Sequence, residues 1–348
     1  METQRLVVDN NVESEKSYTQ AVNLLAEGEI VALPTETVYG LGAVATNEAA
    51  VKKIYSAKGR PSDNPLIVHI GTKEELSKYV DTISEKAVKC MDAFWPGPLT
   101  MIFKAKPNVF AKSVTAGLDT VGIRMPSHPV ALKLLQALGM PVAAPSANRS
   151  GKPSPTEAIH VEQDLAGKIP LILDGGATGV GVESTVLDLT KEIPVILRPG
   201  AITKEMLEEV IGPVDQPTHI EQEQGAPKAP GMKYTHYAPN APVYLIERNK
   251  QIVQEAIQYL QAKDYKVALI ALPSFKELSP DWFFSIGNTQ DEMASHLFHA
   301  LRACDSTDAQ IVLATATSTE GVGAAIMNRL EKSAGGKWYS DFSNALKD

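Results

Sequence analysis

Residues 29–70 read EIVALPTETVYGLGAVATNEAAVKKIYSAKGRPSDNPLIVHI, and they predict two buried strands on either side of a helix. The apolar run 30–33 is followed by an amphipathic segment at 47–57, for which Asn47 is the expected N-cap. A second apolar run at 66–70 predicts the next strand. A strand, a helix and a strand in this order are typical of an α/β sheet.

The same alternation continues through the first two thirds of the chain. Apolar residues at helical spacing predict further helices at 17–27, 73–80, 84–93 and 128–138. Short apolar segments predict further strands at 99–104, 121–124, 141–144, 170–173, 185–189 and 194–197. We therefore expect an α/β fold in which a twisted mixed sheet carries helices.

Residues 212–242 are rich in Pro, Gly and Gln and show no apolar periodicity, which is typical of a linker. The α/β pattern then resumes, with strands expected at 243–246, 267–272 and 311–314 and helices at 250–262, 288–303 and 320–333. The predicted organisation is a first domain at 1–211, a linker at 212–240 and a small Rossmann-like, three-layer domain at 241–348. The first strand-to-helix turn of this last domain lacks G-x-G-x-x-G, which argues against dinucleotide binding.

Composition and charge exclude several classes of protein. The net charge of −8 over 348 residues argues against a general nucleic-acid coat, although a local basic pocket is compatible with it. The two cysteines, Cys90 and Cys304, lie far apart in sequence, so a disulfide framework or a zinc site is not expected and a reducing, cytoplasmic setting is favoured. The chain shows no secretory signal and no apolar run of about 18 residues, so we expect no membrane span.

Two cations, Lys58 and Arg60, follow the predicted helix and precede Pro61. Both side chains could point into one cleft and clamp phosphates, with Arg as a planar fork and Lys as a point charge. A solvated helix end is an equally good interpretation. The chain has no G-x-x-x-x-G-K-[ST] motif, so any phosphate binding must use another device.

Small polar residues follow two of the predicted strands. Ser146 and Asn148 come directly after an apolar run, where open α/β sheets place ligands, although an ordinary polar turn would read the same way. The glycine-rich stretch 175–181 leads to Ser184, and its backbone N–H groups could approach an anion. A flexible hairpin is the stronger interpretation of that stretch taken alone.

Arg124 and Arg198 each end a predicted strand, where an arginine can bind a carboxylate with two hydrogen bonds or form a structural ion pair. His69 lies inside an apolar run, which is more typical of a core histidine than of a ligand. His236 lies in the linker, where no structural requirement explains it.

These segments together are more specific than any one of them. The motif PTETVYGLG at 34–42, the K-x-R of Lys58 and Arg60, the S-x-N at 146–148, STV at 184–186 and LRPG at 197–200 follow one another in the order found in the YrdC/Sua5 family. The linker sequence APGMKYTHYAP at 229–239 is similar to the Sua5 signature, with Ala229 where serine is expected. The resemblance covers nearly the whole chain.

The resemblance implies a bacterial Sua5-type enzyme with a YrdC-like first domain and a C-terminal Sua5 domain. Such a nucleotidyltransferase joins L-threonine, bicarbonate or CO2, and ATP into L-threonylcarbamoyladenylate and pyrophosphate, with Mg2+ assisting. The product serves N6-threonylcarbamoyl modification of adenosine 37 in tRNA. The implied downstream partners are TsaD, TsaB and TsaE, and contact with tRNA itself is expected to be indirect or weak.

The resemblance also assigns roles to residues. Lys58 and Arg60 are the expected catalytic pair, and no side chain is expected to hold the metal, since the ATP phosphates would do so. The expected threonine-binding residues are Thr37, His69, Arg124, Ala144 and Ser184. The expected ATP-binding residues are Thr35, Arg60, Asn64, Thr120, Ser146, Asn148, Ser154, Arg198 and Tyr237. Which of the two threonines faces the substrate stays open.

The linker has an expected role as well. We expect residues 225–239 to close over the ATP site as a lid, with His236 and Tyr237 shielding a hydrolytically labile adenylate from water.

Two other functions fit parts of the pattern. Lys52, Lys53, Lys58 and Arg60 could form a basic surface for double-stranded RNA or tRNA, and such binding would depend on salt and not on threonine. The acidic net charge favours the enzyme. Carbamoyl transfer from carbamoyl phosphate, as in hydrogenase-maturation proteins with a related domain, is the other alternative, but those proteins also carry zinc fingers, which two lone cysteines cannot build.

Overall fold

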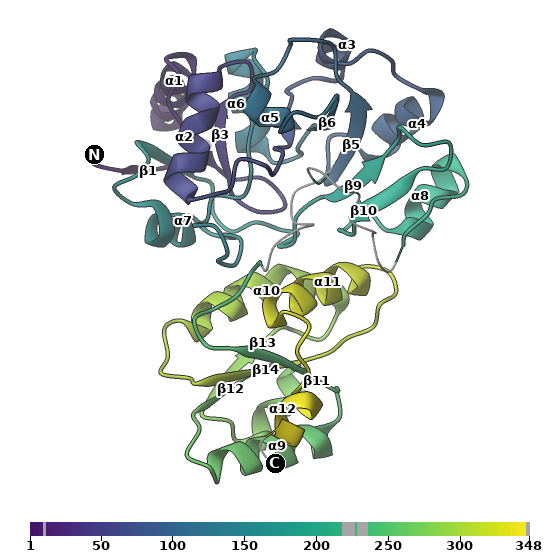
Figure 1. Ribbon diagram of the computed structural model, residues 1–348. Coiled ribbons are helices and arrows are strands. Elements are labelled where there is room, and N and C mark those ends of the chain that lie inside the picture. Colours follow the sequence, from purple (N-terminus) through teal and green to yellow (C-terminus); the bar gives the residue numbers. More distant parts are fainter. Residues whose placement is uncertain (10–11, 218–226, 228–235, 346–348) are drawn as a thin grey trace. The chain divides into compact units, whose positions relative to one another are not determined.

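The computed structural model describes residues 1–9, 12–217, 227 and 236–345 (Figure 1). The chain forms two compact units. The first unit contains Met1–Ser150, Pro155–Gly179 and Glu183–Lys233, and the second contains Gly151–Ser154, Val180–Val182 and Tyr234–Asp348. Most of the expected lid at 225–239 lies outside the described residues.

The first unit is built on one sheet of parallel and antiparallel strands (Figure 1). Its order over the described residues is β1-β8-β2-β3-β7-β4-β6-β5-β9-β10. The strands are β1 Gln4–Val7, β2 Val31–Leu33, β3 Gly40–Val44, β4 Val68–His69, β5 Leu99–Lys104, β6 Thr120–Arg124, β7 Val142–Ala143, β8 Leu171–Asp174, β9 Thr185–Asp188 and β10 Val195–Arg198. Since β5 pairs antiparallel with β6 and parallel with β9, the predicted mixed sheet is confirmed.

Several helices of this unit begin at capping side chains, and α2 (Glu48–Lys58) shows a cap at each end. Asn47 accepts a hydrogen bond from the Ala50 N–H at 3.1 Å, and Gly59 closes the same helix with a left-handed φ of 62°. The helices are α1 Val12–Ala26, α2 Glu48–Lys58, η1 Lys73–Glu75, α3 Leu76–Tyr79, α4 Glu85–Phe94, α5 Lys112–Thr115, α6 Pro129–Leu138, α7 Ala158–Leu165 and α8 Lys204–Ile211.

The two faces of the sheet are covered unequally. On one face, residues of α2, α4, α5, α7 and α8 pack on strands along the whole sheet and form the largest apolar core. On the other face, α1 and α6 pack over β2, β3, β7 and β8. Side chains alternate between faces along each strand, so every strand contributes to both sides.

The second face continues beyond α1 and α6, over β4, β6, β5, β9 and β10. The apolar cluster there consists of Ile67, Ile102 and Val186 with Leu197 against it, and no described helix contributes to this cluster. Polar residues share the face with this cluster, because His69 is paired in register with Val142 of the α1–α6 side and with Arg124. This half of the sheet face positions the candidate site.

The second unit is a parallel sheet in the order β11-β14-β12-β13, with helices on both sides (Figure 1). The cluster of α9, η2 and α12 lies on one side and α10 and α11 lie on the other, which confirms the Rossmann-like expectation. The elements are β11 Val243–Ile246, α9 Lys250–Gln261, β12 Val267–Ala271, η2 Pro273–Leu278, β13 Trp282–Ser285, α10 Gln290–Cys304, β14 Ile311–Thr315, α11 Gly323–Ala334 and α12 Tyr339–Ala345.

The second unit also holds two short segments from the earlier part of the chain. In Gly151–Ser154, the Pro153 carbonyl accepts from NH2 of Arg302 at 2.5 Å, and Lys152 lies 2.7 Å from the Asp305 carboxylate. In Val180–Val182, Gly181 packs so closely on α10 that an added Cβ would lie 2.3 Å from Cα of Ser295. Helix α10 therefore fixes both segments.

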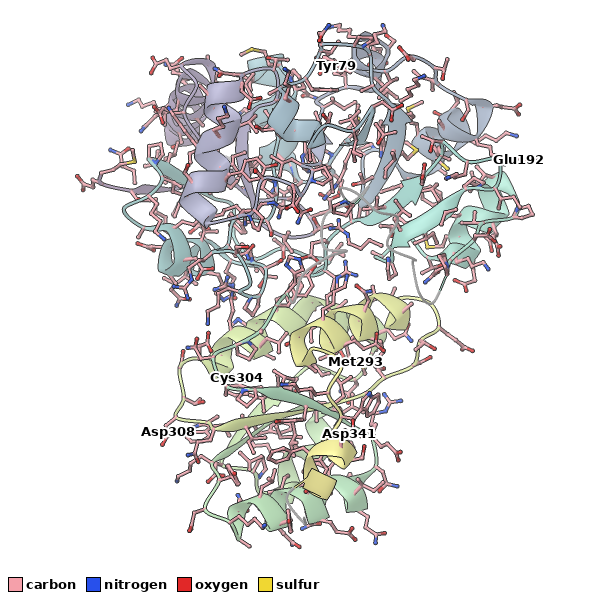
Figure 2. All side chains as sticks on the ribbon, viewed as in Figure 1. Tyr79, Glu192, Met293, Cys304, Asp308 and Asp341 are labelled. Atoms are coloured by element: carbon pink, nitrogen blue, oxygen red, sulfur yellow. The ribbon has the colours of Figure 1, made fainter. Side chains whose placement is uncertain are left out.

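Within the described residues, no helix combines the length and the apolar character that a membrane crossing requires. Cys90 and Cys304 are both buried free thiols, and burial raises their pKa values to about 11 and about 12. Figure 2 shows Cys304 at the end of α10 in the second unit, whereas Tyr79 belongs to the first. Neither cysteine has the lowered pKa of a reactive thiol.

Candidate functional site

Arg124, at the end of β6, joins the sheet to the loop that follows β2. Its NH1 donates to Oγ1 of Thr37 over 2.9 Å, and its NH2 lies 2.7 Å from Oε1 of Glu36. The side chain is only 4% exposed. Its Nε and NH2 have no hydrogen-bond partner among the described residues, because the contact with Glu36 is close but not aligned as a hydrogen bond. An arginine edge of this kind can bind both oxygens of a carboxylate.

The two threonines of the loop differ in orientation, which the sequence leaves open. Thr35 Oγ1 lies 2.7 Å from the carbonyl of Val38 and receives the Thr37 N–H at 3.2 Å, so it closes its own turn. Thr37 Oγ1 accepts a hydrogen bond from NH1 of Arg124 and lies 2.9 Å from Thr35 Oγ1. Thr37 therefore faces the arginine, and Thr35 holds the loop that presents it.

His69 lies opposite Arg124 on the neighbouring strand. Burial, and then the positive charge of Arg124, lower the pKa of His69 to about 3. Its Nδ1 has no hydrogen-bond partner among the described residues. The imidazole is therefore neutral at ordinary pH, and it offers one ring nitrogen beside the arginine for a polar ligand group.

Ser184 and Arg198 meet on the same face. Arg198 donates to the Ser184 carbonyl from Nε at 3.1 Å and from NH2 at 2.9 Å, and to its Oγ at 3.1 Å. Ser184 Oγ also lies 2.8 Å from Oγ1 of Thr100. A register shift between Ile196 and Arg198 turns Arg198 away from the Ile196 face, and this allows the contact.

Lys58, at the end of α2, reaches the loop of residues 146–148. It is only 2% exposed, and its ammonium donates to the carbonyls of Ser146 and Asn148, the latter at 2.6 Å, and reaches Oδ1 of Asn148 at 3.4 Å. Arg60 donates instead to the carbonyl of Pro65 at 3.3 Å. Lys58 thus holds the loop of the predicted nucleotide residues, because its ammonium has three donors and three acceptors.

The remaining predicted residues of the first unit lie on or beside the same face. Asn64 and Thr120 are buried, and Oδ1 of Asn64 has no hydrogen-bond partner among the described residues. Ala144 follows β7, and its N–H donates to the carbonyl of Ile67 at 3.0 Å. A pocket here is lined by Pro65, Leu66, Ile67, Thr100, Ile102, Val114, Thr120, Val121, Gly122 and Val186.

Two predicted nucleotide residues belong to the second unit. Ser154 is fully buried in the segment that α10 fixes. Tyr237 is buried with its ring centroid 5.0 Å from that of Phe298, and its carbonyl accepts from Ser333 at 3.0 Å. Its φ of 67° is left-handed, which is unusual for a residue other than glycine.

The sequence assigned no role to several groups that the structure places in or near this site. Glu36 pairs with Arg124, Thr100 contacts Ser184, and the negative charge of Glu36 acts on the half-buried His128. The acid between two threonines was the available signal for Glu36.

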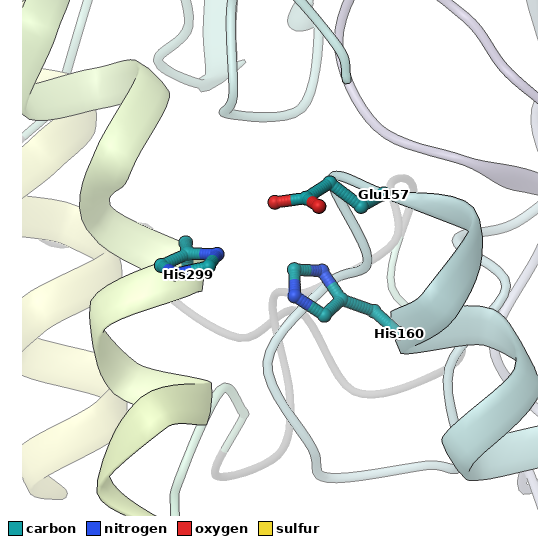
Figure 3. Close-up of side chains that lie close together, drawn as sticks. All are labelled: Glu157, His160 and His299. Carbon is teal, nitrogen blue, oxygen red and sulfur yellow. The ribbon is translucent and has the colours of Figure 1, made fainter. Parts of the chain in front are cut away.

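His160, drawn with Glu157 at the start of α7 in Figure 3, has a structural contact. Its Nδ1 accepts a hydrogen bond from the Thr156 N–H at 3.2 Å and so satisfies the backbone there.

Family models match both parts of the chain. Residues 23–200 match the Sua5/YciO/YrdC model, which is described as "Telomere recombination", and residues 202–335 match the model "Threonylcarbamoyl-AMP synthase, C-terminal domain".

Known proteins resemble the chain over nearly its full length. The threonylcarbamoyl-AMP synthase of Bacillus subtilis is 50% identical, over 97% of this chain and 99% of the relative, and that of Pyrococcus abyssi is 48% identical, over 90% and 93%. The crystal structure of Pyrococcus abyssi Sua5 complexed with L-threonine superposes with a TM-score of 0.91 at 45% identity, over 96% of this chain and 98% of that one. The chain belongs to the Sua5/YrdC family.

Proposed function

We propose that this protein is a threonylcarbamoyl-AMP synthase. It forms L-threonylcarbamoyladenylate and pyrophosphate from L-threonine, bicarbonate or CO2, and ATP. The observation that carries the proposal is the buried Arg124, two of whose guanidinium nitrogens have no hydrogen-bond partner among the described residues and lie beside neutral His69 and the hydroxyl of Thr37. Relatives of the same length carry this activity in their names, and one of them is known with L-threonine bound.

Threonine offers three groups that this site can recognise. Its carboxylate fits the Nε–NH2 edge of Arg124, as a planar two-donor contact. Its hydroxyl needs small polar partners, for which His69, Ser184 and the backbone at Ala144 are suited by position, and its amine needs an acceptor. The apolar side chains of Ile67, Ile102 and Val186 lie on the same half-face and would shield the reacting groups from water.

ATP is proposed to bind at the loops beside the part of the sheet face formed by β4, β6, β5, β9 and β10. Lys58 holds the 146–148 loop, so that Ser146 and Asn148 can present short donors and acceptors to the nucleotide. Arg60 and Arg198 supply the positive charge for the phosphates. The other proposed nucleotide-binding residues are Thr35, Asn64, Thr120, Ser154 and Tyr237. Mg2+ is proposed to be held by the ATP phosphates, since the Glu36 carboxylate is paired with Arg124.

The reaction needs positioning and charge stabilisation more than covalent chemistry from the protein. Threonine becomes a carbamate through its nitrogen, and a carbamate oxygen then displaces pyrophosphate at the α-phosphorus. Arginine donors aimed at the departing phosphates stabilise the charge that develops there, each by about 3 kcal/mol. Burial of the site strengthens these contacts and protects the mixed anhydride from hydrolysis.

The wider assignments are proposals as well. They comprise the domain boundaries 1–211, 212–240 and 241–348, the lid at 225–239, and the cytoplasmic setting that the two separate cysteines favour. The product would serve tRNA threonylcarbamoylation with TsaD, TsaB and TsaE. The alternative RNA-binding surface has less support, because Lys58 is buried, Lys53 lies 2.6 Å from Glu29 and Lys52 lies 3.5 Å from Glu48.

Pyrophosphate release from ATP tests the proposal. Release should require threonine and bicarbonate together, and it should fall when serine or allothreonine replaces threonine. Arg124→Ala should raise the threonine KM, and Arg60→Ala should lower the rate at saturating threonine. Pyrophosphate release that is independent of threonine, or salt-sensitive RNA binding without any release, would reject the synthase assignment.

A further inference from the structure

Glu36 carries a buried carboxylate in the middle of the proposed threonine site. It stands between Thr35 and Thr37, its side chain is 13% exposed, and its Oε1 lies 2.7 Å from NH2 of Arg124. The half-buried His128 also senses this charge, since the negative charge of Glu36 raises the pKa of that histidine against the larger lowering effect of burial. A negative and a positive group therefore lie side by side beneath the surface.

The ion pair is not completed by hydrogen bonds. Neither carboxylate oxygen of Glu36 has a hydrogen-bond partner among the described residues. The same is true of Nε and NH2 of Arg124. Buried charges in proteins are normally both paired and hydrogen-bonded, because desolvation is costly otherwise. Four unsatisfied polar atoms at one place indicate that a ligand completes them.

An amino-acid zwitterion has the complementary charges. Its carboxylate fits the two donors of Arg124, and its ammonium has three donors for an acceptor such as Glu36. His128 cannot take the place of the acceptor at Nδ1, because this atom receives the Val130 N–H at 3.2 Å. The carboxylate of Asp174, another acid near the loop, already accepts hydrogen bonds from Arg5 at 2.7 Å and from the Gly176 N–H at 3.0 Å.

We propose that Glu36 binds the ammonium group of threonine while Arg124 binds its carboxylate, so that the buried pair selects an α-amino acid over the corresponding hydroxy acid. This inference rests on the proposed function. The Glu36–Arg124 contact holds the two charges together, and the zwitterion replaces it with one contact for each residue.

The experiment compares L-threonine with (R)-3-hydroxybutyrate, the same molecule without its amino group, by calorimetric binding to the full-length protein in the presence of ATP. Wild-type protein should prefer threonine by about 30-fold or more, the range expected when one partner of a buried charge pair is removed. In Glu36→Gln, threonine binding should weaken until the preference falls to a few fold. A general structural defect would instead weaken both ligands equally.

The control is Glu29→Gln, which breaks a surface pair with Lys53 and should leave both affinities unchanged. Equal binding of the two ligands by wild-type protein would overturn the proposal even if Glu36→Gln failed to fold. A folded Glu36→Gln that retains the full preference for threonine would overturn it too. Failure of the synthase assignment is a separate result, because wild-type protein would then release no threonine-dependent pyrophosphate.

Discussion

Arg124 and Thr37 are joined by a hydrogen bond of 2.9 Å between NH1 and Oγ1, which links the end of β6 to the loop after β2. This bond uses one end of the guanidinium and leaves its Nε–NH2 edge facing away from Thr37. The loop and the sheet are thereby locked in the orientation in which the arginine can receive a ligand.

Thr37→Val should weaken threonine binding and destabilise the fold. The change keeps the shape but removes the acceptor of a buried charged donor, so we expect about 2 kcal/mol less unfolding free energy and a threonine KM raised by roughly tenfold. Urea unfolding and steady-state pyrophosphate release measure the two effects. Thr37→Ser keeps the hydroxyl and is the matched control. A Thr37→Val protein with an unchanged threonine KM would contradict the proposed orientation.

Lys58→Met should be strongly destabilising even without ATP. Methionine keeps much of the length but leaves the carbonyls of Ser146 and Asn148 without their donor, which should cost about 3 kcal/mol. Thermal and urea unfolding of the ATP-free protein measure this loss. Lys53→Met, at a half-exposed surface pair, should cost less than about 1 kcal/mol. Full stability of Lys58→Met with lost activity would instead assign Lys58 a direct phosphate contact.

Arg198→Lys should separate two kinds of contact with Ser184. Lysine lacks the planar fork that reaches the Ser184 carbonyl from two nitrogens, so a loss of about 2 kcal/mol in unfolding free energy is expected. Ser184→Ala removes only the hydroxyl contacts and should cost less. The ATP KM should rise more in Arg198→Lys than in Ser184→Ala. If Ser184→Ala were the less stable variant, the hydroxyl contacts of Ser184 would matter more than the hydrogen bonds from Arg198 to the Ser184 carbonyl.

His69 should make the protein acid-sensitive. Its pKa is about 3 when folded and 6.5 in its ordinary state, so the unfolded chain binds the extra proton between these values. The stabilisation is complete above pH 6.5 and is lost as the pH falls, by about 2 kcal/mol at pH 5. His69→Gln cannot titrate, so its unfolding free energy should fall by about that much less between pH 7 and pH 5. Parallel pH profiles would contradict the low pKa.

Periodicity predicted most elements because it reports local burial. It missed β3, since the glycines of PTETVYGLG read as a loop. Position 42, inside that strand, needs a glycine because an added Cβ would lie 2.9 Å from the side chain of Val142 and 3.0 Å from that of Leu33. It also missed β1, a four-residue edge strand with little burial.

The candidate site could be named from motifs but not assembled from them. Spacing located Lys58, yet its acceptors lie 88 and 90 residues further along, so only the folded chain reveals that it holds a loop. Arg198 reaches Ser184 through a bulge, which alternation along a strand does not predict. Glu36 was visible as an acid between threonines, but its pairing with Arg124 depends on the sheet order.

Gly181→Ala should disturb the second unit, and Gly179→Ala should not. An alanine Cβ at 181 would lie 2.3 Å from Cα of Ser295 and 2.4 Å from the carbonyl oxygen of Ala294, and its φ of 81° already disfavours a side chain. The Val180–Val182 segment must therefore leave α10, at a cost of at least about 2 kcal/mol in unfolding free energy. At Gly179 nothing lies within 4 Å of an added Cβ. Since Ser184 follows this segment closely, threonine affinity should fall in Gly181→Ala alone. Equal stability of the two variants in urea unfolding would show that α10 does not fix the segment.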